Sequence, residues 1–188
     1  MELYDPTKVG TCVAWGRSHS VYHYGDNEVI RFPHAERWLQ FLLRDRLKLS
    51  DRFKRDITIC KQYFGDYFLI TRVVESPAGE VATIQPYITG HYLSKKDLRN
   101  DSTKLRFQEM VTRYDRMVAA GYEVDLIGQG GVLRRRLSNV LVLPDGSLKL
   151  FDATVADIRQ IEKSTSVAQF IAKLILKRQR STLRFLLS

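Results

Sequence analysis

Short apolar runs separated by small and polar residues fill most of the first 88 positions of the chain. The runs are rich in β-branched and aromatic residues, which predicts strands, and the tight turns between the first three predict an antiparallel meander. We expect strands at 11–15, 21–24, 28–32, 57–60, 67–74 and 81–88. Between the third and fourth of these strands, apolar positions at helical spacing predict a helix from His34 to about Leu49.

In the second half of the chain the apolar positions recur mainly at helical spacing. One helix is expected from Lys104 to Ala120, and Gly121 is suited to end it in a left-handed conformation. Another helix, with many basic residues, is expected from Val167 to Leu187. The pattern predicts the α+β class, with a β-rich half over 1–88 and a helix-led half over 89–188.

Two short apolar strands flank a Pro-Asp-Gly turn in the second half. We expect them at Val140–Leu143 and Leu148–Phe151, and the turn is typical of a β-hairpin. Asn139 stands just before the first strand and Asp152 just after the second, so the hairpin brings an amide oxygen and a carboxylate to the same end. Such oxygen ligands suit a hard cation such as Mg²⁺. In the alternative interpretation, Asn139 caps a turn and Asp152 caps a helix.

Length and composition add a preference for anionic partners. The 188 residues fit one domain, or two small lobes within one chain. Hydrophobic residues make up 44% and charged residues 27%, which is ordinary for globular proteins. The formal net charge of +9 favours nucleotide phosphate, nucleic acid, an acidic protein surface or an anionic membrane surface, without choosing among them.

The two cysteines, Cys12 and Cys60, lack the spacing of a metal site, and reduced thiols are their expected state. The first residues form neither a basic nor an apolar leader. No apolar run approaches the length of roughly 18 residues that a membrane-spanning helix needs. These features predict a cytoplasmic protein without a transmembrane segment.

The order of these elements, with the hairpin between Asn139 and Asp152, resembles the protein-kinase-like superfamily. Asp152 follows Asn139 by 13 positions, and the two are similar to the catalytic-loop Asn and to the Asp of the Asp-Phe-Gly motif. Asp152-Ala153-Thr154 departs from that motif after its first residue. The resemblance implies one two-lobed kinase-like domain over 1–188, with a β-rich N-lobe and a truncated helical C-lobe. It also implies ATP as a cofactor and Asn139 and Asp152 as ligands of Mg²⁺.

Two further stretches resemble the nucleotide-binding parts of kinases. The segment from Pro86 to Leu93 is similar to the hinge, whose backbone holds the adenine ring, so the resemblance assigns Tyr87 and Ile88 to nucleotide binding. The segment 14–21 fits the glycine-rich loop at Gly16 and Val21, while Ala14 and His19 replace its outer glycines.

Arg31 stands where kinases carry the nucleotide-binding lysine on the third strand. An arginine supplies positive charge and a bidentate fork for phosphate, with a different geometry. Its expected partner is a carboxylate on the next helix, for which Glu36 and Asp45 both qualify and Glu36 is preferred. In the alternative interpretation, Arg31 is an exposed strand residue.

Asp125 is the candidate catalytic base. Kinases place an Asp five residues before the catalytic-loop Asn, but Arg134 occupies that position here. Asp125 follows the helix and Gly121 as the kinase motif does, and the glycine-containing segment 127–131 could loop out while both ends stay in place. Asp125 would then deprotonate the acceptor hydroxyl. In the alternative interpretation it is a helix-terminus Asp, and the basic segment 134–136 is a solvated loop rather than a substrate contact.

The resemblance thus implies an atypical small kinase that transfers the ATP γ-phosphoryl group to a hydroxyl of an unidentified small molecule or protein. Only 36 residues follow Asp152, as in reduced members of the superfamily. One rival is a pseudokinase that acts as a nucleotide- or partner-binding module, which Arg31, the missing glycines and the displaced Asp125 favour. Another is a basic nucleic-acid-binding protein, and the basic last helix could instead lie on an anionic membrane surface.

Overall fold

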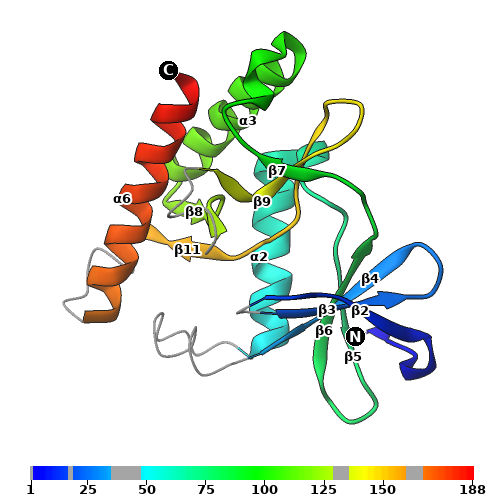
Figure 1. Cartoon of the computed structure of the whole chain (residues 1–188). Coiled ribbons are helices and arrows are strands. Elements are labelled where there is room, and N and C mark those ends of the chain that lie inside the picture. The colour runs from blue at the N-terminus through cyan, green and yellow to red at the C-terminus, as the bar shows by residue number, and fades with distance from the viewer. Residues whose placement is uncertain (1, 17–18, 35–47, 129–135, 160–166) are drawn as a thin grey trace. The chain divides into compact units, whose positions relative to one another are not determined.

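The computed structural model describes residues 2–16, 19–34, 48–128, 136–159 and 167–188. The chain forms two compact units, each described by itself below. The N-terminal unit comprises Met1–Ile57 and Leu69–Ile88, and the C-terminal unit comprises Thr58–Phe68 and Thr89–Ser188. Figure 1 traces the chain from blue at the N-terminus to red at the C-terminus.

The N-terminal unit is built on a six-stranded sheet in the order β1-β5-β6-β4-β3-β2. The strands are β1 Glu2–Leu3, β2 Val9–Trp15, β3 His19–Tyr24, β4 Glu28–Pro33, β5 Arg72–Glu75 and β6 Val81–Pro86. β2, β3 and β4 form the predicted antiparallel meander, which is confirmed. One buried cluster lines the sheet, formed by Tyr4, Tyr24, Ile30, Val74, Ala82 and Ile84.

The C-terminal unit combines helices with two small antiparallel sheets, in the orders β10-β9-β7 and β11-β8. Its strands are β7 His91–Leu93, β8 Tyr122–Val124, β9 Leu137–Val142, β10 Leu148–Leu150 and β11 Val155–Asp157. The helices described in the chain are α2 Leu49–Phe64, α3 Asp101–Ala119 and α6 Val167–Leu187. Short 3-10 helices span Pro6–Lys8, Gly65–Tyr67 and Asp97–Arg99. The predicted α+β class and the last helix are confirmed.

Helix α3 confirms the predicted helix, although it begins at Asp101 rather than at the predicted Lys104. Asn100 caps its N-terminus by accepting a hydrogen bond from the Thr103 N–H at 3.1 Å. Its buried face recurs every three or four residues, at Thr103, Phe107, Met110, Tyr114 and Met117. Gly121 then takes a positive φ of 89°, and its N–H donates to Val118 O at 2.9 Å, which confirms the predicted left-handed end of the helix.

The predicted hairpin is also confirmed. β9 and β10 pair in antiparallel register, with Leu148 opposite Val142 and Leu150 opposite Val140. Gly146 occupies the turn with a φ of 74°, as the turn requires. Asn139, predicted to stand just before the first strand, lies within β9, and the hairpin places it beside Phe151, which follows β10.

The strand predicted at 57–60 is wrong, because these residues lie within helix α2. The run Ile57-Thr58-Ile59-Cys60 is β-branched, but burial along α2 recurs at Arg52, Asp56, Ile59 or Cys60, and Phe64. That spacing is helical, and it overrides the local β propensity. The helix predicted from His34 to Leu49 falls almost wholly on 35–47, outside the described residues.

The strand predicted at 67–74 is too long at its start. Tyr67 ends a 3-10 helix, Phe68 makes only an isolated parallel bridge to Leu150, and β5 begins at Arg72. The apolar run was misleading because Phe68 and Leu69 are buried without a continuous ladder of strand hydrogen bonds. Among the described residues, no helix is both long and apolar enough to cross a membrane.

Candidate functional site

Asp125 and Asn139 meet because the chain folds back on itself between β8 and β9. The Asn139 N–H donates to Leu126 O and the Ser138 N–H donates to Ile127 O, both at 3.2 Å. The start of β9 is thereby bonded to the segment that follows Asp125. The two predicted site residues lie side by side although 14 positions separate them in the sequence.

The Asn139 side chain is held by the backbone of Asp125. Its Nδ2 donates to Asp125 O at 2.7 Å, and the residue is only 8% exposed. Its own carbonyl accepts the Phe151 N–H at 3.2 Å, which brings the residue before Asp152 to the same end of the hairpin. Because Nδ2 is engaged, the amide oxygen is the atom of Asn139 suited to a cation.

Asp152 is oriented by the residue two positions later. The Thr154 hydroxyl donates to Asp152 Oδ1 at 2.9 Å and the Thr154 N–H donates to the same oxygen at 3.2 Å. The Thr154 carbonyl in turn accepts the Asp125 N–H at 3.1 Å. The structure therefore brings together Asp125, Asn139 and Asp152, all within the C-terminal unit.

The Asp125 carboxyl has a strongly altered acidity. Burial, and to a smaller extent the negative charge of Asp152, raise its pKa from 3.8 to about 6. The Gly128 N–H, which donates to Asp125 Oδ1 at 2.8 Å, and the Ile127 N–H oppose this shift by stabilising the charged form. A carboxylate with this pKa can accept and return a proton near neutral pH.

We predict that Asp125→Asn makes stability less sensitive to pH. The folded-state pKa of Asp125 lies above its unfolded value, so its stabilising contribution is complete below pH 3.8 and is lost as pH rises through about 6. Two pKa units correspond to at most about 3 kcal/mol, and partial solvent exposure reduces the expected change to about 2 kcal/mol. The measurement is urea unfolding at pH 4 and pH 8 in the presence of EDTA. Between pH 4 and pH 8, the free energy of unfolding of the variant should rise by this amount relative to that of wild type.

The control for this prediction is Asp26→Asn, which changes an exposed turn carboxylate in the N-terminal unit. Its stability relative to wild type should differ little between the two pH values. Equal pH dependence of wild type and Asp125→Asn would contradict the assigned environment of Asp125.

Gly128 is a site residue that sequence reasoning treated only as part of a flexible loop. It adopts a positive φ of 54°, and a Cβ added there would lie 2.8 Å from Asn139 Oδ1. A side chain at this position would therefore occupy the space beside the amide oxygen. The glycine content of 127–131 was the available sign in the sequence, and the fold shows that Gly128 lies beside Asn139.

Arg31 lies on β4 of the N-terminal unit, opposite Val21 on β3 and Thr83 on β6. The residue is 8% exposed, which excludes the alternative of an exposed strand arginine. One of its contacts is a hydrogen bond from Nη1 to Gln85 Oε1 at 3.4 Å. Gln85 itself donates to the Thr71 hydroxyl at 2.8 Å, so a buried polar row crosses the sheet beside Arg31.

The other predicted nucleotide contacts also belong to the N-terminal unit. Gly16 follows β2, and its N–H donates to His19 O at 2.9 Å, which closes the turn toward β3. Tyr87 and Ile88 follow β6, and the Tyr87 N–H donates to Asn27 O at 2.8 Å, so a nucleotide contact by Tyr87 would not use this group. Glu36 and the alternative Asp45 lie outside the described residues.

Helix α2 carries two buried charged residues, both of which precede the run predicted as a strand at 57–60. Arg52 is 1% exposed and Asp56 is 2% exposed, one helical turn apart. Asp56 accepts from the neighbouring Arg55 Nε at 2.9 Å. Both buried residues lie in the N-terminal unit with Arg31, and Asp56 is a buried carboxylate on α2. In the sequence, the i, i+4 spacing of Arg52 and Asp56 indicates that they share a face only if the segment is taken to be a helix.

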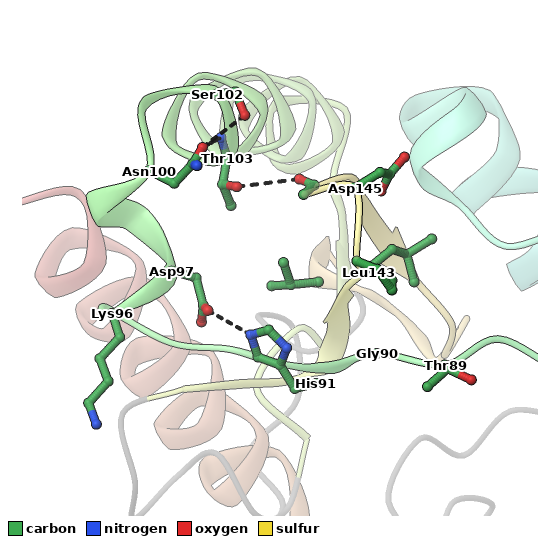
Figure 2. Close-up of a pocket in the computed structure, with 13 residues that line it drawn as sticks. Thr89, Gly90, His91, Lys96, Asp97, Asn100, Ser102, Thr103, Leu143 and Asp145 are labelled. Carbon is green, nitrogen blue, oxygen red and sulfur yellow. Dashed lines mark hydrogen bonds and ion pairs between the residues drawn. The ribbon is translucent and has the colours of Figure 1, made fainter.

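A separate cavity of about 630 Å³ opens in the C-terminal unit, lined by residues around β7, the start of α3 and the β9–β10 turn. Figure 2 shows the His91 and Asp97 side chains pointing toward one another, joined at 2.6 Å, and Thr103 directed at the hairpin turn. Asp125, Asn139 and Asp152 are not among its lining residues. This cavity and the predicted site are therefore different places.

Solved structures similar to this chain include a kinase. The Legionella pneumophila Lpg2603 kinase bound to IP6 matches with a TM-score of 0.57 and 13% sequence identity, covering 94% of this chain and 58% of that one. The Mycobacterium tuberculosis Rv3197–erythromycin complex matches with a TM-score of 0.44 and 17% identity, covering 79% of this chain and 46% of that one. No protein-family model and no curated protein sequence matches the chain.

The fold is kinase-like. The predicted fold class, with a β-rich N-lobe and a reduced helical C-lobe, is thereby confirmed. The chain spans 58% of the length of the Legionella kinase that it matches. At 13% identity the similarity establishes the fold alone, and the chemistry has to be argued from the residues of this chain.

Proposed function

We propose that the chain is a small kinase-like phosphotransferase that moves the γ-phosphoryl group of ATP to a hydroxyl group with the help of Mg²⁺. The observation that carries this proposal is the convergence of Asp125, Asn139 and Asp152 within the C-terminal unit. These residue types are the base and the two Mg²⁺ ligands of the kinase site that the sequence resembles.

The donor set fits Mg²⁺. An amide oxygen and a carboxylate are hard oxygen ligands, and Gly128 leaves space beside Asn139 Oδ1 that a Cβ would fill. Within the described residues, no group of three or more His, Cys, Asp or Glu could hold a metal ion. We therefore expect Mg²⁺ to bind together with nucleotide phosphate, because two protein ligands leave most of its coordination sphere to phosphate and water.

The residues of the chain would divide the work as follows. Asp125 would orient the acceptor hydroxyl and accept its proton, for which a pKa of about 6 is suited. Asn139 and Asp152 would hold Mg²⁺, and the bound ion would neutralise the charge on the transferring phosphoryl group. The hydrogen bonds from Thr154 to Asp152 fix the carboxylate before the ligand arrives, which lowers the cost of ordering.

In the N-terminal unit, Gly16, Arg31, Tyr87 and Ile88 remain predicted nucleotide contacts. Arg31 would supply positive charge to phosphate, with Glu36 or Asp45 as its carboxylate partner. The acceptor is a hydroxyl-bearing small molecule or protein, and the net charge of +9 favours an anionic one.

The test of the proposal is ATP consumption by the purified chain with and without Mg²⁺, together with the thermal shift that Mg·ATP produces. We expect consumption only with Mg²⁺, and a stabilising shift that Mg²⁺ or ATP alone does not match. Stabilisation by Mg·ATP without consumption would identify a pseudokinase. No stabilisation by Mg·ATP, with nucleic-acid binding that weakens steeply with salt, would favour the nucleic-acid-binding rival.

Gly128→Ala should reduce ATP consumption by about 10- to 100-fold, because the new Cβ would displace the Asn139 amide. The positive φ should also lower stability by about 1–2 kcal/mol. Gly25→Ala is the matched control, since Gly25 has a φ of 60° and an added Cβ would meet nothing within 4 Å. Both variants should lose stability in urea unfolding, and only Gly128→Ala should lose activity. Equal activity in the two variants would contradict a role for this space.

A further inference from the structure

A buried amide from the last helix contacts the backbone on both sides of Asp125. Gln179 lies on α6, is 1% exposed, and is separated from Asp125 by more than 50 positions. The reaction proposed above assigns it no role. A polar side chain this deeply buried is costly unless its hydrogen bonds are satisfied. Apart from a hydrogen bond to the Tyr114 hydroxyl at 3.2 Å, those of Gln179 go to one short segment.

The amide oxygen of Gln179 serves the residues just after Asp125. Its Oε1 accepts the Leu126 N–H at 2.7 Å and the Ile127 N–H at 3.3 Å. These two N–H groups lie beyond the end of β8, in a bend, where no helix or strand ladder supplies an acceptor. Gln179 therefore supplies the hydrogen-bond acceptor that a helix or strand would otherwise provide for these two N–H groups.

The amide nitrogen of Gln179 serves the residues just before Asp125. Its Nε2 donates to Val124 O at 2.8 Å and to Glu123 Oε1 at 3.0 Å. One side chain thus spans the peptide groups from Val124 to Ile127. Asp125 lies inside that span, with its own N–H donating to Thr154 O and its carbonyl accepting from Asn139.

Glu123 determines which way the Gln179 amide faces. The Glu123 side chain is fully buried, and it also accepts hydrogen bonds from the Tyr114 hydroxyl and from Arg180 Nη2, the latter at 2.9 Å. A carboxylate repels another acceptor, so the amide nitrogen must face Glu123 and the amide oxygen must face the two N–H groups. A glutamate at position 179 would place two carboxylates against each other in a buried site.

We propose that Gln179 is a positioning residue, which holds the backbone around Asp125 and so keeps Asp125 beside Asn139. This inference rests on the proposed function for the role of Asp125, whereas the hold on the backbone does not depend on it. Glu123, Tyr114 and Arg180 support the arrangement by fixing the orientation of the amide.

The first test is hydrogen exchange of the Leu126 and Ile127 amides, measured by NMR on the full chain. Gln179→Met keeps the length of the side chain and removes the amide, and Leu183→Ala is the control because it loosens packing on the same helix. Compared at matched global stability, exchange of the two amides should rise at least about tenfold in Gln179→Met and not in Leu183→Ala. Equal exchange in the two variants would overturn the inference.

A reciprocal exchange keeps the inference testable if Gln179→Met does not fold. Gln179→Glu should lose protection of the same amides, because a carboxylate oxygen would face both Glu123 and Val124 O. The double variant Glu123→Gln with Gln179→Glu should regain part of it, because the new amide at position 123 can donate to the carboxylate at position 179, while Val124 O still lacks its donor. Absence of any recovery in the double variant would count against the orientation assigned here.

The last measurement separates this inference from the proposed function. If both hold, Gln179→Met should lower kcat for ATP consumption by about 10- to 100-fold with little change in the KM for ATP, while Leu183→Ala changes neither. Wild-type chain that consumes no ATP, together with the expected exchange result, would overturn the proposed function and leave the positioning of Asp125 supported. An unchanged kcat in Gln179→Met with active wild type would overturn the positioning role.

Discussion

Asp152→Ala should lower Mg²⁺-dependent ATP consumption by about 100- to 1,000-fold. In the proposed site Asp152 supplies the carboxylate ligand of Mg²⁺, and loss of metal-assisted charge stabilisation removes several kcal/mol from the transition state. The Thr154 N–H and hydroxyl orient this carboxylate, so the variant removes a ligand that is already held in place. The measurement is the initial rate of ATP consumption at saturating Mg²⁺.

The control for this variant is Asp157→Ala, which removes another acidic side chain of the C-terminal unit. Asp157 forms an ion pair with Arg159 at 3.5 Å and has no part in the proposed site, so its loss should leave the rate unchanged. Thermal unfolding of both variants would show that each is folded at the assay temperature. Equal rates for wild type and Asp152→Ala would contradict the assignment of Asp152.

Arg180→Ala should destabilise the protein by about 3 kcal/mol. The Glu123 carboxylate is fully buried and Arg180 Nη2 lies 2.9 Å from it, so the variant leaves a buried negative charge without its cationic partner. Removal of one partner of a buried pair typically costs about 3–5 kcal/mol, and the lower end applies because the Arg180 side chain is 45% exposed. Urea unfolding near neutral pH gives the change directly.

Two further variants isolate the cause of this loss. Arg184→Ala removes an exposed arginine one helical turn later and should change stability by less than about 0.5 kcal/mol. Glu123→Gln removes the buried charge, so Arg180→Ala should cost much less in that background. Additive effects of Glu123→Gln and Arg180→Ala would show that the two side chains do not stabilise each other.

The elements that could be predicted from the sequence are those with local causes. The Pro-Asp-Gly turn and its flanking apolar runs determine the β9–β10 hairpin, and Gly121 marks the end of α3. The meander followed from short strands and tight turns. Each of these elements is determined by residues a few positions apart in the sequence. Propensity and periodicity are properties of such short segments, so they can predict these elements.

The errors arose where tertiary context decided between helix and strand. The run Ile57–Cys60 has β-branched residues, but burial of Arg52, Asp56 and Phe64 at helical spacing places it in α2. A buried Arg and Asp do not register as apolar positions in a sequence pattern, so the helical period was hidden.

The candidate site was accessible to sequence reasoning only in part. The hairpin predicted that Asn139 and Asp152 share an end, and order along the chain suggested Asp125. The roles of Gly128 and Gln179 were not accessible, because they depend on contacts with Asn139 and with the backbone around Asp125. Contacts between polar residues that are far apart in the sequence produce no periodic pattern or characteristic spacing from which they could be predicted.

The most direct test of the account is an experimental structure of the chain with Mg²⁺ and a non-hydrolysable ATP analogue. We expect Mg²⁺ at about 2.1 Å from Asn139 Oδ1 and from an Asp152 carboxylate oxygen, with phosphate oxygens completing its coordination and the γ-phosphoryl group facing Asp125. Nucleotide bound with its metal away from Asn139 and Asp152, or Asp125 turned away from the γ-phosphoryl group, would contradict the account.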